Sequence, residues 1–303
     1  MSKGKLSVYS FLPLGAAFVW GMGFTAQIFA SGSIQPFFYN ALRFALGGIA
    51  LLPLVFLLDK NVKATFKSTV KYGIAAGVIL CMGASFQQIG LTLTQSAAKG
   101  GFFTALYAVL VPFIEAIIFK KRLSKKIYIA SVLSFLGLFC IFISSESVKS
   151  LLQITFGDLL LLINALCYAF HIIFIDRVIN KVSPVLFAVV QFLTVSILSG
   201  VICLVFETPN VEAIRNSYIP IIYGGLVSVG CEEAEDDKEG AGLIHEVPEA
   251  YRQREERLDT QQEEEAHGSG RASWTVFRHL LEVPRLASVY NFCTCCVIPY
   301  AAI

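Results

Sequence analysis

Residues 97–126 read AAKGGFFTALYAVLVPFIEAIIFKKRLSKK, an apolar run up to Phe119 that is followed directly by a run of basic residues. A helix needs ~20 mostly apolar residues to cross the ~30 Å hydrocarbon core of a bilayer, and residues 97–119 reach that length. Lys and Arg collect in the cytoplasmic loops beside membrane helices. The stretch therefore predicts a transmembrane helix that ends at the cytoplasmic face.

Apolar runs of similar length lie on both sides of this stretch. Together with residues 97–119 they give about eight expected spans: 8–30, 36–58, 71–91, 126–144, 156–176, 184–206 and a short one at 217–230. The runs are continuous rather than alternating, which argues against a β-barrel. Short links such as SGSIQP and TLTQSAA join several of the runs, and they predict antiparallel helical hairpins.

The composition supports the same fold class. The 303 residues are 55% hydrophobic and 15% charged, with a mean hydropathy of +0.67. A soluble domain of this length needs a more strongly charged surface. A cleaved signal peptide is an alternative for residues 8–30, because Lys3 and Lys5 precede them, but the run is long and lacks a clear cleavage site. We expect an all-α polytopic membrane protein.

The basic residues of the short loops indicate the orientation. With the N-terminus in the cytoplasm, thirteen Lys and Arg residues fall in inside loops, whereas only Lys99, Lys149 and Arg215 fall in outside loops. This asymmetry is the one that cytoplasmic loops show. The run KKRLSKK could also be read as a nucleic-acid or targeting patch, but its two flanking spans favour a topological anchor. The expected location is the plasma membrane.

An internal repeat appears when the sequence is shifted by 148 positions. The shift places Trp20 on Tyr168, Pro36 on Pro184, Arg43 on Gln191, Phe44 on Phe192 and Gly77 on Gly225. A copy of five spans has an odd number of crossings, so the second copy starts from the opposite side of the membrane. The pattern predicts an inverted repeat, from which many secondary transporters are built.

Three segments resemble the EamA-type members of the drug/metabolite transporter superfamily. They are LPLGAAFVWGMGFTAQ at 12–27, PFFYNALRF at 36–44 and TQSAAKGGFFTALYAVLVPFIEAIIFKKRL at 94–123, which a glycine-containing span follows. The resemblance covers about residues 8–230. It implies ten helices in two five-helix repeats, both termini inside, and a substrate cavity between the repeats. It also implies transport of metabolites, amino acids or drugs, commonly outward.

The expected domains are a first repeat at 8–144, an incomplete second repeat at 156–230 with about three helices, and an acidic segment at 231–303. Residues 231–303 hold 7 Lys and Arg against 15 Asp and Glu, whereas residues 1–230 hold 17 against 7. Such an acidic segment cannot enter hydrocarbon. Two interpretations remain, a disordered cytoplasmic tail or a shift of reading frame, and the abrupt change inside a span favours the second. With the second repeat cut short, we expect this chain to transport poorly or not at all.

Polar residues inside spans are candidate functional residues, because they are costly in hydrocarbon. Arg43 lies about seven residues into its span, at a depth of roughly 10 Å, where its cation could hold an anionic substrate group. Snorkelling to the surface is the alternative role. The other candidates for substrate binding are Trp20, Gln87, Gln88, Tyr107, Tyr168 and Gln191. For these, helix packing is the alternative.

Glu115 and His171 could form a proton relay, but ion pairing and packing are the favoured roles. The eight cysteines show no spacing that demands a disulfide framework or a zinc site. No nucleotide-binding loop, paired metal ligands or nucleophile constellation is visible in the hydrophobic region. No cofactor, metal or enzymatic activity is therefore expected.

The sequence predicts a secondary transporter for small metabolites or drugs, an exporter that works by alternating access. A non-transporting membrane scaffold with an acidic cytoplasmic tail is the alternative. The expected partners are a small-molecule substrate and the lipid bilayer, with a homodimer as one option and no nucleic acid.

Overall fold

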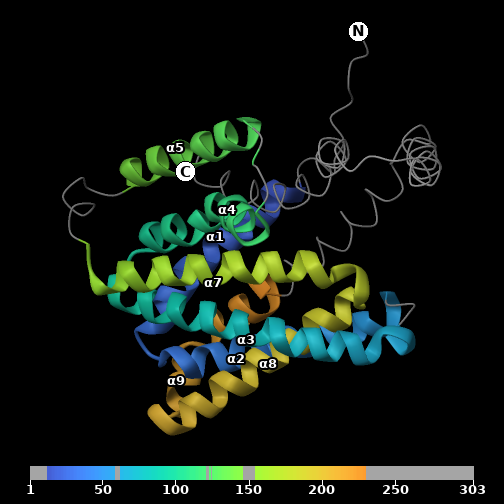
Figure 1. The fold of residues 1–303 in the computed structure, drawn as a ribbon. Helices are drawn as coiled ribbons and strands as arrows, with labels where there is room; N and C mark the ends of the chain where they lie inside the picture. The colour runs from blue at the N-terminus through green and yellow to red at the C-terminus, as the bar shows by residue number, and fades with distance from the viewer. Residues whose placement is uncertain (1–11, 59–61, 121–122, 124, 146–153, 230–303) are drawn as a thin grey trace, which may run out of the picture.

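The computed structural model describes residues 12–58, 62–120, 123, 125–145 and 154–229 (Figure 1). The long helices are α1 (Leu12–Ser31), α2 (Pro36–Leu58), α3 (Val62–Thr94), α4 (Ala97–Phe119), α5 (Lys125–Ser145), α7 (Phe156–Val178) and α8 (Pro184–Phe206). The short ones are the 3₁₀ helix η2 (Ile179–Lys181), α9 (Val211–Asn216), α10 (Tyr218–Ile222) and the π-helix η3 (Tyr223–Val229). The described residues contain no strand, so the all-α prediction is confirmed.

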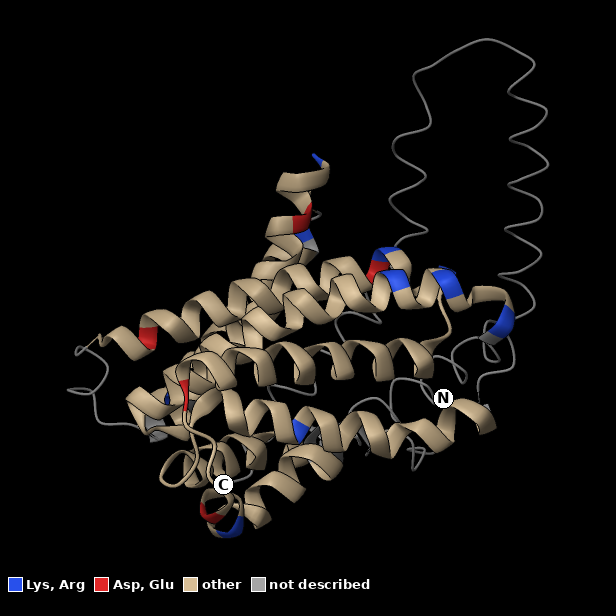
Figure 2. Ribbon diagram, turned by 90° about the horizontal axis from the view of Figure 1, so that it is seen from below, with Lys and Arg blue, Asp and Glu red and all other residues tan. Residues whose placement is uncertain are grey.

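Five of the described helices are long and apolar enough to cross a membrane. They are Pro36–Leu57, Lys63–Thr94, Ala97–Phe119, Phe156–Lys181 and Pro184–Phe206. The expected spans 8–30, 126–144 and 217–230 correspond to α1, α5 and α10 with η3, and two shorter apolar helices, Ile127–Cys140 and Tyr218–Val227, lie there. Charged residues of the described helices gather mainly near the helix ends (Figure 2). The chain is thus a polytopic membrane protein.

The helices form a bundle in which α2, α3, α7 and α8 pack most closely. The most extensive contacts join α2 to α8, α3 to α7 and α8, and α4 to α7, while α5 lies against α4 at the side of the bundle (Figure 1). Large apolar side chains remain exposed along α5 and α8, among them Leu133 and Leu204. In a membrane protein such side chains face lipid, because the hydrocarbon is as apolar as they are.

Local sequence explains where several helices begin. Ser96 accepts a hydrogen bond from the backbone N–H of Lys99 and so caps α4. Thr155 and Asp158 form a reciprocal capping box at the start of α7. Pro184 occupies the first turn of α8, where a missing N–H costs nothing.

Contacts between helices repeat at the same offset of 148 residues. A Cβ atom added to Gly77 of α3 would lie 2.8 Å from the carbonyl oxygen of Gln191 on α8, and one added to Gly225 of η3 would lie 2.8 Å from the carbonyl oxygen of Arg43 on α2. Gly77 matches Gly225 and Gln191 matches Arg43 under the offset, so the same crossing occurs twice. Each crossing brings two backbones so close that a side chain would displace one of them.

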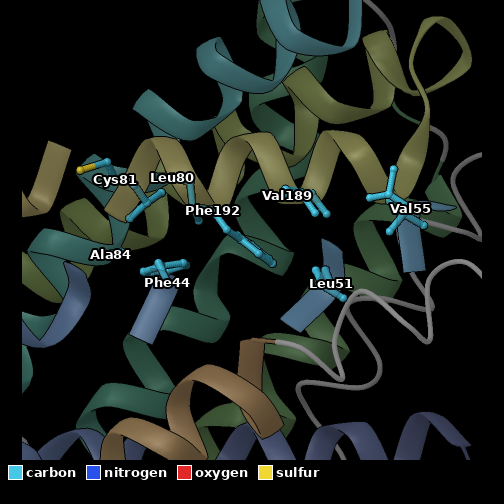
Figure 3. Close-up of a cluster of buried hydrophobic side chains, with 11 residues drawn as sticks. Phe44, Leu51, Val55, Leu80, Cys81, Ala84, Val189 and Phe192 are labelled. Carbon is cyan, nitrogen blue, oxygen red and sulfur yellow. The ribbon is translucent and has the colours of Figure 1, made fainter. Parts of the chain in front are cut away.

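The main apolar core lies between α2, α3 and α8 (Figure 3). Its labelled members are Phe44, Leu51 and Val55 of α2, Leu80, Cys81 and Ala84 of α3, and Val189 and Phe192 of α8. Phe44 and Phe192 are also related by the offset, and their ring centroids lie 5.7 Å apart. The core therefore contains a contact between matching positions of the two copies.

The structure extends one expected span. Helix α3 spans 33 residues, beyond the expected span 71–91 at both ends, because a helix continues through Lys63 and Lys67 where hydropathy falls. Asp158, at the start of α7, is only 3% exposed. The acidic segment 231–303 lies outside the described residues. The second copy is described up to Val229.

Candidate functional site

Arg43 is a buried cation on α2. Its side chain is 4% exposed, and its guanidinium carbon lies 5.3 Å from the ring centroid of Tyr39 and 4.8 Å from that of Phe44. Within the described part of the chain its Nε atom has no hydrogen-bond partner, and no acidic side chain pairs with it. Cation–π contacts compensate only part of the lost hydration of a guanidinium. The geometry leaves donor capacity for an anionic group.

The repeat-related residue Gln191 has a different environment. Its Oε1 atom lies 3.0 Å from Nε2 of His171 on α7, and both side chains are buried. The shift of 148 positions places His171 on Gly23. The residue that matches the α7 partner of Gln191 is therefore a glycine, which has no side chain. This makes the two halves of the site electrostatically unequal.

A chain of hydrogen bonds links α3, α4 and α7. The Gln87 amide donates to Thr104 Oγ1 at 3.3 Å, and Thr104 donates to Asn164 Oδ1 at 2.9 Å. The Asn164 amide donates to the carbonyl oxygen of Gly83 at 3.1 Å, and the Tyr168 hydroxyl lies 3.5 Å from Gln87 Oε1. Thr104 and Asn164 are fully buried. Sequence reasoning missed both, although each is a polar residue within an apolar run.

The aromatic candidates lie beside this polar chain. The rings of Tyr107 and Tyr168 meet edge to face with centroids 6.3 Å apart, and Trp20 packs against the same apolar cluster. Gln88 lies elsewhere: its amide donates to the carbonyl oxygen of Gln27 on α1 at 3.3 Å. The structure thus brings Gln87, Tyr107, Tyr168 and Trp20 together, whereas Gln88 faces another helix.

A buried ion pair joins α4 to α7 near their N-terminal ends. Lys99 Nζ lies 2.9 Å from Asp158 Oδ2, with side-chain exposures of 8% and 3%. The same oxygen accepts from the backbone N–H and the hydroxyl of Thr155. The sequence analysis counted Lys99 with an outside loop, but Lys99 belongs to the first turn of α4, inside the expected span 97–119.

Glu115 pairs with a basic residue of α7. Its Oε1 atom lies 3.4 Å from NH2 of Arg177 on α7, and both side chains are partly exposed. His171 contacts Gln191 rather than Glu115 in the described geometry. Among the described residues, no group of three or more His, Cys, Asp or Glu side chains could hold a metal ion.

Comparison with known proteins gives relatives for this fold. An uncharacterized transporter of Archaeoglobus fulgidus is 31% identical over 212 residues, which are 70% of this chain and 63% of that protein. The uncharacterized transporter YwfM of Bacillus subtilis is 26% identical over 165 residues, 48% of each chain. The chain therefore spans less than two thirds of the length of these curated relatives.

A solved crystal structure shares the fold. It is 18% identical, covers 77% of this chain and 79% of its own, and superposes with a TM-score of 0.56. The model of the EamA-like transporter family matches residues 7–143 and 155–231. The resemblance inferred from the sequence is thereby confirmed, and the chain belongs to the EamA-like transporter family.

Proposed function

We propose that the chain is a secondary transporter that exports small metabolites or drugs by alternating access of two inverted repeats, residues 8–144 and 156–230. The observation that carries the proposal is the doubled helix crossing at Gly77 and Gly225, made against Gln191 and Arg43 respectively. Two halves that make the same contact in opposite orientation can exchange conformations, which is how inverted repeats move a central site between two faces. A proton gradient or substrate exchange drives the step.

Arg43 is the residue proposed to hold the substrate. A buried guanidinium without an acidic partner among the described residues binds an anionic group more strongly than water-exposed cations do. The group formed by Gln87, Trp20, Tyr107 and Tyr168 supplies amide, hydroxyl and aromatic surfaces for the rest of the substrate. Gln191 takes part through His171. Gln88 is also a proposed site residue, and its amide donates to the carbonyl oxygen of Gln27 on α1.

The proposed membrane is the plasma membrane, with the N-terminus in the cytoplasm. Single cysteines are placed at Lys125 or Ile154 on an otherwise cysteine-free chain, and a membrane-impermeant maleimide is added to intact cells. The cysteine at 154 is expected to be labelled, and the one at 125 is expected to be protected. Ile154 is 82% exposed and lies before α7 on the predicted outer side. Labelling of position 125 together with protection of position 154 would contradict the proposed orientation.

The purified full chain is expected to bind a small anion even where flux is poor. The measurement is the apparent Tm of the chain in detergent with a panel of organic anions and their neutral or cationic analogues. A rise in Tm confined to anions supports the site, because a ligand stabilises the state that binds it. No rise with any anion contradicts it. Uptake in proteoliposomes is expected near background, since the acidic composition of residues 231–303 is not that of membrane spans.

The scaffold alternative rests on the acidic segment 231–303. Removing that segment distinguishes the two functions. A scaffold loses its bound partner protein after the deletion, whereas the anion-dependent rise in Tm of the transporter persists. A homodimer is also proposed, and the elution volume of the same preparations on size-exclusion chromatography tests it.

A further inference from the structure

Two charged contacts cross between the first five helices and the later ones at the same end of the bundle. One is the Lys99–Asp158 pair between α4 and α7. The other joins Glu207, which follows α8, to the N-terminus of α2: its two carboxylate oxygens accept from the backbone N–H groups of Phe37 and Phe38 at 2.9 and 2.8 Å. Both lie where α2, α4 and α7 begin.

The Glu207 contact satisfies two N–H groups that a helix leaves without partners. The negative charge also lies at the positive end of the α2 dipole. A second bond supports it, because the backbone N–H of Thr208 donates to Gln35 Oε1 at 2.9 Å. Residues after α8 therefore bind the first turn of α2 from two sides. Arg43 lies on that helix about two turns further on.

Among the described residues, the contacts at the opposite end of the bundle are weaker. The described ion pair there between the two sets of helices is Arg177–Glu115, at 3.4 Å with the Arg177 side chain 43% exposed. The backbone N–H of Ser183 donates to Thr69 Oγ1, and the Ser68 hydroxyl donates to the carbonyl oxygen of Lys181. Exposed ion pairs and neutral hydrogen bonds separate at lower cost than a buried ion pair or a carboxylate on a helix terminus.

We propose that Lys99–Asp158 and Glu207 with the α2 N-terminus form the outer gate of the transporter. The gate rests on the proposed alternating access, and in the described conformation it is shut. Opening toward the outer side requires both contacts to break, so they set the population of the outward-open state. The Arg177–Glu115 pair at the other end does not control that opening.

Solvent access to Cys167 tests the gate without any substrate. Cys167 lies mid-way along α7 beside Tyr168. A Cβ atom added to Gly83 of α3 would lie 3.4 Å from the Cβ atom of Cys167. The full chain, with Cys167 as its sole cysteine, is placed in nanodiscs and treated with a charged maleimide. A charged reagent reaches this thiol only through water between the helices. Because both faces of a nanodisc are open, the assay does not depend on topology.

Two sets of variants weaken the gate. Glu207→Gln removes one charge from a half-buried site, and Lys99→Gln with Asp158→Asn removes both charges of the buried pair together. The combined variant is expected to raise the labelling rate of Cys167 by about tenfold or more. The reason is that it loses the charged hydrogen bonds that stabilise the shut state, so the open state becomes more populated. The matched control is Glu115→Gln, which should leave the rate unchanged.

The single variant Lys99→Gln keeps the proposal testable, because it breaks the ion pair but leaves the Asp158 acceptor that Thr155 uses. It is expected to raise the labelling rate of Cys167 in a chain that retains Glu207, by less than the combined variant does. An unchanged rate in Glu207→Gln and in the combined variant, with elution volumes like that of the parent, would overturn the gate. Equal acceleration by Glu115→Gln would also overturn it. A gate that fails here leaves anion binding by Arg43 intact, so the two proposals can fail separately.

Discussion

Replacing Asp158 by alanine is expected to destabilise the protein by about 3–5 kcal/mol, because the Lys99 ammonium would remain buried without its carboxylate. The side chains of this pair are 8% and 3% exposed, so water does not replace the lost partner readily. The same substitution removes the acceptor that Thr155 uses at the start of α7. Both effects lower the free energy of unfolding.

A mutant cycle separates the charge effect from the loss of the cap. Asp158→Ala, Lys99→Gln and the double variant are compared by denaturant unfolding in detergent. The double variant is expected to be more stable than Asp158→Ala alone, because it removes the buried cation together with the carboxylate that lies beside it. Glu115→Ala at the exposed pair should cost less than about 1 kcal/mol. Equal losses for Asp158→Ala and Glu115→Ala would contradict the role assigned to burial.

Replacing Arg43 by glutamine is expected to weaken anion binding by about tenfold to a hundredfold, the loss of a charged hydrogen bond of ~1.5–3 kcal/mol. Glutamine is the residue at the matching position 191, so the variant makes the two halves of the site alike. Arg43→Lys should fall between, because it keeps the charge but loses the planar fork of donors.

The stability of the Arg43 variant distinguishes binding from packing. If Arg43 binds substrate, Arg43→Gln should unfold no more easily than the parent, since a buried cation without an acidic partner in the described structure is removed. If Arg43 only packs against Tyr39 and Phe44, the free energy of unfolding falls in the variant and the anion affinity stays the same. Lys71→Gln, which removes an exposed cation from α3, is the matched control for net charge.

The span at 97–119 could be predicted to the residue, because a long apolar run has one way to cross a bilayer. The ends of α3 could not, since its first turns carry lysines that hydropathy excludes but a helix accepts. The Lys99–Asp158 pair joins residues 59 positions apart. Its formation depends on how α4 and α7 are rotated and shifted against each other, which a linear pattern does not encode.

The candidate site shows the same division. Single polar residues within spans, such as Arg43 and Gln87, can be found by their cost in hydrocarbon. Which of these residues contact each other cannot be predicted from the sequence. Gln87 bonds to Thr104, whereas its neighbour Gln88 bonds to α1. Successive residues of a helix point about 100° apart, so two adjacent amides reach different neighbours.

Phe44 and Phe192 touch across the bundle although each is the counterpart of the other. In an ancestor built from two identical chains, that contact would have been one residue meeting itself, and any substitution would have entered twice. A larger ring would have clashed from both sides at once, and a smaller one would have left a doubled void. In one polypeptide each ring can change alone, so substitutions at this contact can proceed one ring at a time.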